Sequence, residues 1–393
     1  MTPLVDTHFM PDIQSSLKSS RYIVLRKLGE GVTSSTWLVR DTLSSPQMYA
    51  AAKILTYEAT ADQLCVRELE FLQTITRGAE TNDSEEGFEH LPFLYDHFTI
   101  DVGGPGNTAQ THLCLIQTLF STSVSALRRS APTQSLPIYM VRSFIYMTLQ
   151  ALQTLHSLHI IHTDLKLDNI LFSNAQFSYD ADLERYLLEH PAEVDSEGVP
   201  KSQPLPNEWT HETSALQAER MTVALVDYGH AEWAEKPMAK NFCPMALRPP
   251  EVILAAGVST AVDIWAIGCL TFELLVGRWL FSPEDGGDDW TQEDDHLAKM
   301  MELTGQFDFP QSVLERSQLK DKYFDETGNL LRVPELIPVK LEDAISNYKI
   351  QALDDNDIRE AADFIRSCLH LDWTQRKTAE ELLKHPFALQ AFS

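Results

Sequence analysis

Three short apolar runs follow one another near the start of the chain, and glycine and polar residues separate them. They are RYIVLRKLGEG (21–31), STWLVRD (35–41) and MYAAAKIL (48–55). Short β-type runs divided by turn residues predict an antiparallel meander. Another run, THLCLIQTLF (111–120), predicts one more strand, and the apolar spacing within 59–75 predicts a helix.

The apolar positions take a helical period beyond about residue 120. One face of 139–159 carries Val141, Phe144, Ile145, Leu149, Leu152 and Leu155. Further helices are predicted at 259–276, 295–303, 357–370 and 378–384. We therefore predict an α+β fold of two lobes: a strand-rich N-lobe over about 21–118 and a helical C-lobe over about 119–390. Residues 1–20 are predicted to form a flexible tail.

One segment does not fit a compact core. Residues 173–220 contain ten acidic and three basic residues together with prolines 191, 200, 204 and 206. We predict an acidic surface insertion, with a short helix at 181–189.

Charge is the most informative bulk property of the chain. Subtracting 31 basic from 57 acidic residues gives a net charge of −26, which argues against direct binding of duplex nucleic acid. A basic partner is compatible with this charge, and so is the simpler alternative of general solubility.

From the remaining bulk features we expect neither a membrane-spanning protein nor a secreted one. No apolar run is long enough to span a membrane, and the first residues lack the pattern of a secretory signal. Five scattered cysteines show no metal-ligand spacing, so we expect reduced thiols in a protein of the cytoplasm, the nucleus or both.

A glycine-containing turn joins the first two predicted strands. Gly29 and Gly31 would let backbone N–H groups approach phosphate oxygens, although an ordinary tight hairpin uses the same residues. Lys53 follows on an apolar strand, where its charge needs a partner, and Glu68 on the next helix is the candidate. The alternative for this pair is an ordinary surface ion pair.

The octet HTDLKLDN (162–169) places dense polarity directly after a long apolar helix. Asp164 can accept a proton from an attacking hydroxyl, Lys166 can steady a transferring phosphoryl group, and Asn169 offers an oxygen to a divalent cation. A second metal carboxylate is then required, and VALVDYG supplies Asp227. The alternative is a set of ordinary loop residues, but this order of motifs makes coincidence a poor explanation.

With these motifs, residues 21–390 resemble the eukaryotic protein kinases. PPE (249–251), VDIWAIGC and WTQRKTAEELLKHPF look like the segments that brace the C-lobe of that family. Within the family, HTDLK, STWL and the helix DDHLAKMMELTG are most similar to the SR protein kinases, and in particular to a diverged fungal set of them. Dual-specificity kinases that act on splicing factors come second.

The resemblance implies a Ser/Thr kinase that uses ATP and Mg²⁺ to phosphorylate a basic, Arg/Ser-rich protein, and we expect a monomer. Asp164 and Lys166 are the implied catalytic residues, and Asn169 and Asp227 the metal ligands. Residues implied to contact the nucleotide or to hold it in place are Leu28, Gly29, Gly31, Ser34, Thr36, Lys53, Glu68, Thr118 and Phe120. Asp263 is implied to be structural, and Glu251 and Arg376 to form a structural ion pair.

The sequence departs from the family pattern in three places, and the first two departures favour a second interpretation. Ser34 replaces the third glycine, Pro244 stands where the family has a threonine that contacts the catalytic aspartate, and Gln117 and Thr118 are unusual at the nucleotide hinge. The alternative to an enzyme is therefore a pseudokinase that acts as a binding module.

Thr163 replaces the arginine that pairs with a phosphorylated activation segment in most kinases. Independently, residues 229–251 contain no Ser, Thr or Tyr. We predict a segment fixed by apolar contacts of Trp233, Met238, Phe242, Met245 and Leu247, and an enzyme that needs no phosphorylation there.

The segment 283–295 contains seven acidic residues and no Lys or Arg. Asp295 and Glu302 lie two helical turns apart and share a face, and the resemblance implies that they bind arginine-rich segments. The alternative is that Asp294 and Asp295 cap a helix. Arg278 stands where the family tends to have an acid, which would weaken binding of basic peptides.

Overall fold

The computed structural model describes residues 8–81, 87–103, 109–173, 177, 180–238, 242–333, 335–350 and 353–392. The chain forms two compact units, and each is described by itself. The first comprises 1–123, 171–208 and 226–229, and the second comprises 124–170, 209–225 and 230–393. We call them the N-lobe and the C-lobe.

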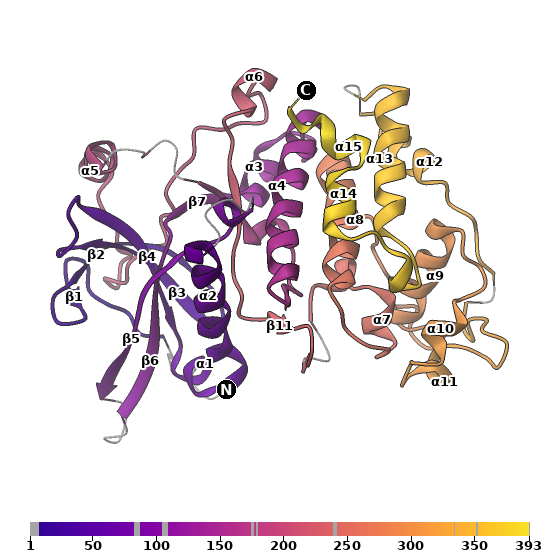
Figure 1. Ribbon diagram of the computed structural model, residues 1–393, viewed down its shortest axis with the longest axis horizontal. Coiled ribbons are helices and arrows are strands. Elements are labelled where there is room, and N and C mark those ends of the chain that lie inside the picture. The colour runs from indigo at the N-terminus through magenta and orange to yellow at the C-terminus, as the bar shows by residue number, and fades with distance from the viewer. Residues whose placement is uncertain are drawn as a thin grey trace. The chain divides into compact units, whose positions relative to one another are not determined.

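The N-lobe is built on an antiparallel sheet of six strands in the order β1-β2-β3-β4-β6-β5 (Figure 1). Its strands are β1 (Ser16–Leu17), β2 (Tyr22–Glu30), β3 (Ser34–Asp41), β4 (Met48–Leu55), β5 (Leu94–Gly103) and β6 (Ala109–Gln117). A short strand β7 (Phe120–Ser123) pairs with β9 (Ile170–Ser173). The predicted meander is therefore present.

The structure corrects three details of this lobe. Residues 16–17 form β1 and Leu17 is buried against the sheet, so the predicted flexible tail is ordered at least from residue 8 to residue 20. The strand β5 was not predicted. The predicted helix at 59–75 is two helices, α1 (Tyr57–Ala61) and α2 (Gln63–Thr81), because Asp62 between them has extended backbone.

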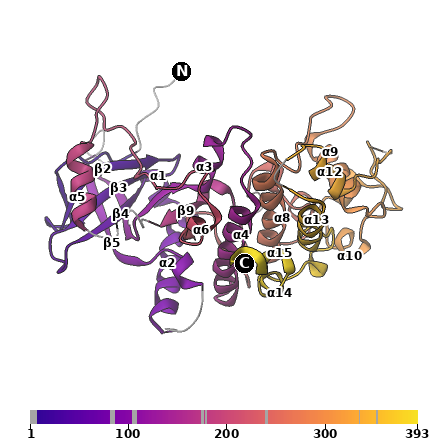
Figure 2. The same cartoon turned by 90° about the horizontal axis from the view of Figure 1, so that it is seen from above.

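Most of the acidic insertion belongs to the N-lobe. Its helix α5 (Asp180–Glu189) lies beside the strands β2 and β3 in Figure 2. Leu183 and Leu205 pack with Leu38 of β3 in one apolar cluster, and the Tyr49 hydroxyl donates to Glu184 at 2.8 Å. The segment 180–208 therefore covers apolar surface of the sheet, although its composition is polar.

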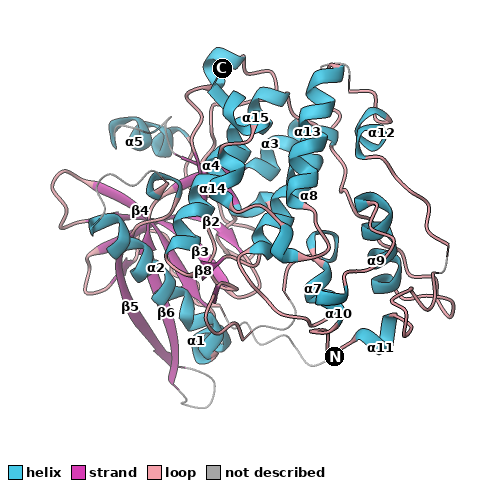
Figure 3. Ribbon diagram, turned by 45° about the vertical axis from the view of Figure 1, so that its right-hand side comes forward, coloured by secondary structure: helices cyan, strands magenta, loops and turns pink. Residues whose placement is uncertain are grey.

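The C-lobe is helical around two long helices, α4 (Ile138–Ser157) and α8 (Ala261–Val276), which contact each other (Figure 3). The sequence of α8, AVDIWAIGCLTFELLV, is apolar on every side, and all but the first of its residues are buried. This is the pattern of a central helix rather than a surface helix. Gly277 ends α8 with a φ of +77° and leaves no room for a side chain beside Thr133 and Gln134.

The remaining elements surround these two helices. The helices are α3 (Val124–Ser130), α6 (Ala215–Ala218), α7 (Pro250–Ile253), α9 (Gln292–Thr304), α10 (Gln311–Leu314), α11 (Lys320–Tyr323), α12 (Leu341–Ser346), α13 (Asp355–Cys368), α14 (Ala379–Leu383) and α15 (Pro386–Leu389). Short strands are β8 (Ile160–Ile161), β10 (Val223–Leu225) and β11 (Glu232–Trp233). No helix in the described ranges has the length and apolarity that crossing a bilayer requires.

Candidate active site

Gly29, Thr36 and Lys53 lie in one row across the N-lobe sheet. Gly29 is opposite Thr36 in the β2–β3 ladder, and Thr36 is opposite Lys53 in the β3–β4 ladder. The register therefore brings the glycine turn, Thr36 of β3 and the buried lysine together, although Gly29 and Lys53 are 24 positions apart in the sequence.

The glycine turn does not need glycine for its own folding. The backbone angles of Gly29 and Gly31 lie outside the left-handed region, and a side chain at Gly29 would meet no atom within 4 Å. Gly31 N–H donates to the carbonyl of Ser34 at 2.8 Å, which closes the hairpin. Because the internal geometry tolerates a side chain here, the glycines are better explained by close approach of a ligand than by the hairpin alone.

Lys53 forms ion pairs with two carboxylates of the N-lobe. Its Nζ lies 2.7 Å from Glu68 Oε1 and 2.8 Å from Asp227 Oδ1. Burial alone would lower the pKa of Lys53, but the charges of Asp227 and Glu68 raise it above its ordinary value. The lysine is therefore cationic and fixed beside Asp227, which suits a group that holds phosphate oxygens.

Several residues predicted to contact the nucleotide also contact other parts of the N-lobe. Thr118 donates its N–H to the carbonyl of Phe93 at 3.0 Å, and its hydroxyl accepts from the Phe93 N–H at 2.9 Å. These groups hold β5, so only the Thr118 carbonyl remains for a nucleotide. Phe120 starts β7 opposite Ser173, and Leu28 packs in the apolar cluster of Leu38 and Leu183. Ser34 begins β3 and is buried.

The catalytic loop of the C-lobe joins three of the predicted residues. Oδ2 of Asp164 accepts from Lys166 Nζ at 2.5 Å and from Asn169 Nδ2 at 3.2 Å. Asn169 Nδ2 also donates to the Asp164 carbonyl at 2.9 Å. Within the described ranges Asp164 Oδ1 forms no hydrogen bond, so one carboxylate oxygen is held in place and the other is available to a substrate hydroxyl.

Asp263 of α8 holds the start of this loop. Its carboxylate accepts from the N–H groups of His162 and Thr163, both at 2.9 Å, and from His156 Nε2 at 3.0 Å. Thr163 has a φ of +64°, which is unusual for a β-branched residue and needs support from its surroundings. The Thr163 hydroxyl adds support by donating to the carbonyl of His230 at 2.6 Å.

The activation segment packs on the C-lobe through apolar side chains. β11 pairs with β8, so that Trp233 lies opposite Ile160. Phe242 is buried in a cluster with Ile161, Val252 and Val262. Leu247 is buried as well and Met245 half-buried, but 57% of the Met238 side chain is exposed, so the predicted contribution of Met238 is wrong. Residues 239–241 lie outside the described residues.

Glu251 and Arg376 form the ion pair that the family resemblance implies. Arg376 donates to the two carboxylate oxygens of Glu251 at 2.7 Å each, and both side chains are almost fully buried. Arg376 also donates to the carbonyl of Ala261 and lies over the ring of Trp265. The pair therefore links the end of the activation segment to the helical core.

The two predicted docking carboxylates already have partners inside the C-lobe. Asp295 pairs with Lys299 at 2.7 Å and accepts from the Glu284 N–H at 2.6 Å. Glu302 accepts from the Ile337 N–H at 2.8 Å. The capping box at the start of α9 is formed by Asp294 and Thr291. Asp294 therefore caps the helix, whereas Asp295 and Glu302 hold flanking loops.

Oxygen donors for a divalent metal are present in both lobes. Asn169 Oδ1 accepts no hydrogen bond from the described residues, and the Asp227 side chain is 39% exposed. Hard cations such as Mg²⁺ prefer carboxylate and amide oxygens, so each of these two side chains is by itself a suitable ligand. The described residues contain no cluster of three or more His, Cys, Asp or Glu side chains that could hold a metal, so most of its other ligands would come from phosphates and water.

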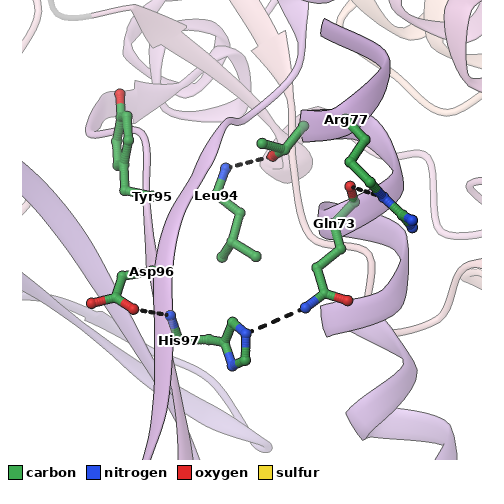
Figure 4. Close-up of a pocket in the computed structure, with 7 residues that line it drawn as sticks. Gln73, Arg77, Leu94, Tyr95, Asp96 and His97 are labelled. Carbon is green, nitrogen blue, oxygen red and sulfur yellow. Dashed lines mark hydrogen bonds between the residues drawn. The ribbon is translucent and has the colours of Figure 1, made fainter. Parts of the chain in front are cut away.

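A cavity of about 540 Å³ lies elsewhere in the N-lobe, between α2 and β5 (Figure 4). Gln73 Nε2 and His97 Nε2 lie 3.3 Å apart across it, and the Leu94 N–H donates to Thr76 at 2.9 Å. These polar groups bond one another, and none of the predicted site residues lines the cavity.

Comparison with known proteins agrees with the geometry of both lobes. The protein kinase domain family matches residues 22–388. The chain belongs to the protein kinase family. It is an enzyme that uses ATP and a divalent metal, and its relatives include kinases named as serine/threonine-protein kinases and others named as dual-specificity kinases.

The kinase is similar to several proteins over nearly its whole length. Serine/threonine-protein kinase SRPK of Physarum polycephalum is 28% identical over 94% of this chain and 86% of its own. Protein kinase dsk1 of Schizosaccharomyces pombe is 24% identical over 93% and 80%. The dual specificity protein kinase lkh1 of the same yeast is 26% identical over 97% of this chain and 49% of its own. The chain is thus an SRPK-like Ser/Thr kinase.

Proposed function

We propose that this kinase transfers the γ-phosphoryl group of Mg²⁺-ATP to Ser or Thr of a basic, Arg/Ser-rich protein, and that it does so without phosphorylation of its activation segment. The catalytic part of this proposal rests on the different environments of the two carboxylate oxygens of Asp164. One carboxylate oxygen is held by Lys166 and Asn169, and the other is uncommitted among the described residues.

Asp164 Oδ1 accepts the proton of the substrate hydroxyl as the hydroxyl oxygen attacks the γ-phosphorus of ATP. The bond between this phosphorus and the β–γ bridging oxygen breaks, and ADP leaves. Lys166 offsets the charge on Asp164 and on the transferring group. Lys53, oriented by Glu68, binds phosphate oxygens of the nucleotide. Asp227 and Asn169 would hold the metal ion, which would offset negative charge on the phosphates.

A basic substrate is supported by the acids of the C-lobe. Glu284, Asp285, Asp288 and Asp289 are exposed in one loop before α9, where no Lys or Arg interrupts them. A chain of net charge −26 also attracts cationic partners. The names of two relatives, SRPK and dsk1, agree with a kinase of this group.

Independence from phosphorylation is supported by the contacts of Thr163. Arginine at this position would leave a positive charge unpaired until a phosphate arrived. Threonine instead bonds to the His230 carbonyl within the segment, and Phe242 anchors the segment in the core. We also propose that the kinase acts in the cytoplasm, the nucleus or both, as a protein with free cysteines and a protein substrate requires.

The test is radiolabelled phosphate transfer to an Arg-Ser repeat peptide, with an acidic peptide of equal length as the control. Bacterially produced protein is treated with a broad phosphatase, and mass spectrometry establishes that no phosphate remains. We expect transfer to the basic peptide alone, with Mg²⁺ restoring activity after chelation. Transfer that requires prior treatment with another kinase contradicts the second half of the proposal.

A further inference from the structure

A second cavity, of about 350 Å³, lies in the C-lobe beside the loop that follows α8. It is lined by Arg128, Gln134, Gly277, Arg278, Trp279, Ser282 and Tyr348. These residues come from three parts of the chain: α3 with the loop after it, the loop after α8, and the turn after α12. None of them belongs to the predicted catalytic, nucleotide, metal or docking residues.

A buried ion pair forms part of the wall of this cavity. Arg128 Nη2 lies 2.8 Å from Glu273 Oε1, and Arg128 Nη1 donates to the Gly277 carbonyl at 3.3 Å. Glu273 also accepts from Trp279 Nε1 at 3.1 Å. The negative charge of Glu273 is therefore enclosed and already matched by Arg128. The Nε of the buried Arg128 has no partner among the described residues.

Arg278 supplies the uncompensated charge of the cavity. Its side chain is exposed, forms no ion pair within the described ranges, and donates only to the carbonyl of its neighbour Gly277 at 3.2 Å. Trp279 and Tyr348 contribute rings that are 53% and 45% exposed. An exposed guanidinium that is not paired with a carboxylate can donate two parallel N–H bonds to an anion.

The cavity lies close to the catalytic loop of the same lobe. Helix α3, which carries Arg128, contacts the short 3-10 turn Leu167–Asn169 of that loop. Arg129, the next residue of α3, pairs with Asp168 at 3.3 Å. Helix α3 therefore links the wall of the cavity to the loop that carries Asp164.

We infer that this cavity binds an anionic side chain of the peptide substrate, a carboxylate or a phosphate, and that Arg278 determines this specificity. The inference rests on the proposed function insofar as the substrate is a peptide. It adds a requirement that a basic substrate alone does not predict: one acidic or phosphorylated residue at a defined distance from the acceptor. The planar guanidinium of arginine suits either anion because it donates two parallel N–H bonds.

The experiment uses Arg-Ser acceptor peptides in which glutamate, phosphoserine or alanine is placed in turn at each position around one acceptor serine. KM and kcat are measured for the parent kinase, for Arg278→Glu, and for Arg359→Glu as the matched control. Arg359 is an exposed arginine of α13 that undergoes the same change of charge. Thermal unfolding of the three proteins shows that the exposed substitutions leave the fold intact.

We expect one position at which glutamate or phosphoserine lowers KM by about five- to tenfold relative to alanine, the size of a charge-assisted hydrogen bond, with little change in kcat. Arg278→Glu should abolish this preference and Arg359→Glu should keep it. A preference for phosphoserine over glutamate identifies phosphate as the anion, and the reverse order identifies carboxylate. The absence of any anion preference, or a preference that survives in Arg278→Glu, overturns the inference.

Fluorescence anisotropy of the same labelled peptides separates this inference from the proposed function. If no peptide is phosphorylated, the proposed function fails, but the dissociation constants still report on the cavity. Tighter binding of the anionic peptides to the parent than to Arg278→Glu supports the cavity in that case. Equal dissociation constants overturn it.

Discussion

The hydroxyl of Thr163 donates to the backbone carbonyl of His230 at 2.6 Å. This bond ties the catalytic loop to the first residues of the activation segment within the C-lobe. We propose that this bond replaces the arginine–phosphate pair that orders the activation segment in most kinases.

Removing the Thr163 hydroxyl should destabilise the packed conformation of the activation segment. Thr163→Val keeps the shape of the side chain but leaves the His230 carbonyl without its donor, so we expect a loss of about 1 kcal/mol in the free energy of unfolding. We also expect lower kcat in fully dephosphorylated protein. Thr163→Ser, which keeps the hydroxyl, is the control. Equal activity of the Thr163→Val and Thr163→Ser variants argues that the hydrogen bond has no role in ordering the segment.

Asp164→Asn should separate catalysis from binding. The amide keeps the size of the side chain but cannot take the proton, so we expect kcat to fall by at least about 10² while the dissociation constant for ATP stays nearly unchanged. Asp343→Asn, an exposed change on α12, serves as the control. Parental kcat in Asp164→Asn removes this residue from the mechanism.

Breaking the Glu251–Arg376 pair should destabilise the C-lobe. Arg376→Met leaves the buried Glu251 carboxylate unpaired, at a cost of about 3–5 kcal/mol in urea unfolding. Adding Glu251→Gln removes that charge, so the double variant should be more stable than Arg376→Met alone. If the second change adds to the damage instead, the unpaired charge is not the cause.

The buried His296 should make the free energy of unfolding depend on pH. The ring is fully buried in α9, neither ring nitrogen has a partner in the described ranges, and burial, together with the charges of Arg248 and Lys299, lowers its pKa to about 3. Between about pH 6.5 and pH 3 the unfolded chain therefore binds one more proton than the folded chain at this residue. Stability should fall as the pH is lowered through that window, by up to about 1.4 kcal/mol per pH unit from His296.

The matching variant is His296→Phe, which removes the titrating group. Its free energy of unfolding, measured by denaturant titration at several pH values, should decline less steeply than that of the parent below about pH 6.5, the ordinary pKa of histidine. The same substitution at the exposed His97 should leave the slope unchanged. Identical slopes for the parent and His296→Phe exclude His296 as the source.

If Asp295 and Glu302 bind the substrate, removing them and removing Lys299 should change the KM for a basic peptide in opposite directions. Asp295→Ala with Glu302→Ala should raise KM for a basic peptide with kcat nearly constant, and the parental KM should rise with salt because exposed charge pairs are screened. Lys299→Ala frees the Asp295 carboxylate from its internal partner and should lower KM. If the parental KM does not change with salt and Lys299→Ala has the parental KM, Asp295 and Glu302 serve only to hold the loops around α9.

Local patterns in the sequence predicted most of the longer elements and indicated the candidate site residues. Short apolar runs separated by glycine and polar residues predict β2, β3 and β4, and a further run predicts β6. The apolar period of 139–159 predicts α4 for the corresponding helical reason. The octet at 162–169 is short, so the spacing of Asp164, Lys166 and Asn169 alone indicates their chemistry.

Contacts between distant segments were decided only by the tertiary structure. The acidic composition of 180–208 favours solvent, yet Leu183 and Leu205 pack on the sheet, because a few apolar residues suffice to bury one side of a short helix. Composition likewise assigned residues 16–17 to a flexible tail, but backbone hydrogen bonds to β2 make them a strand. Met238 is apolar and still exposed, because burial depends on which surfaces the fold brings beside a residue.

The two arginines of the C-lobe cavity also differ because of contacts that only the fold creates. Their charge is visible in the sequence, but the partner of each is not, because an ion pair depends on which carboxylate the fold brings within a few ångströms. Arg128 meets Glu273, which is 145 positions away, and its charge is thereby neutralised. Arg278 meets none among the described residues, and only the folded chain shows that its charge remains for a ligand.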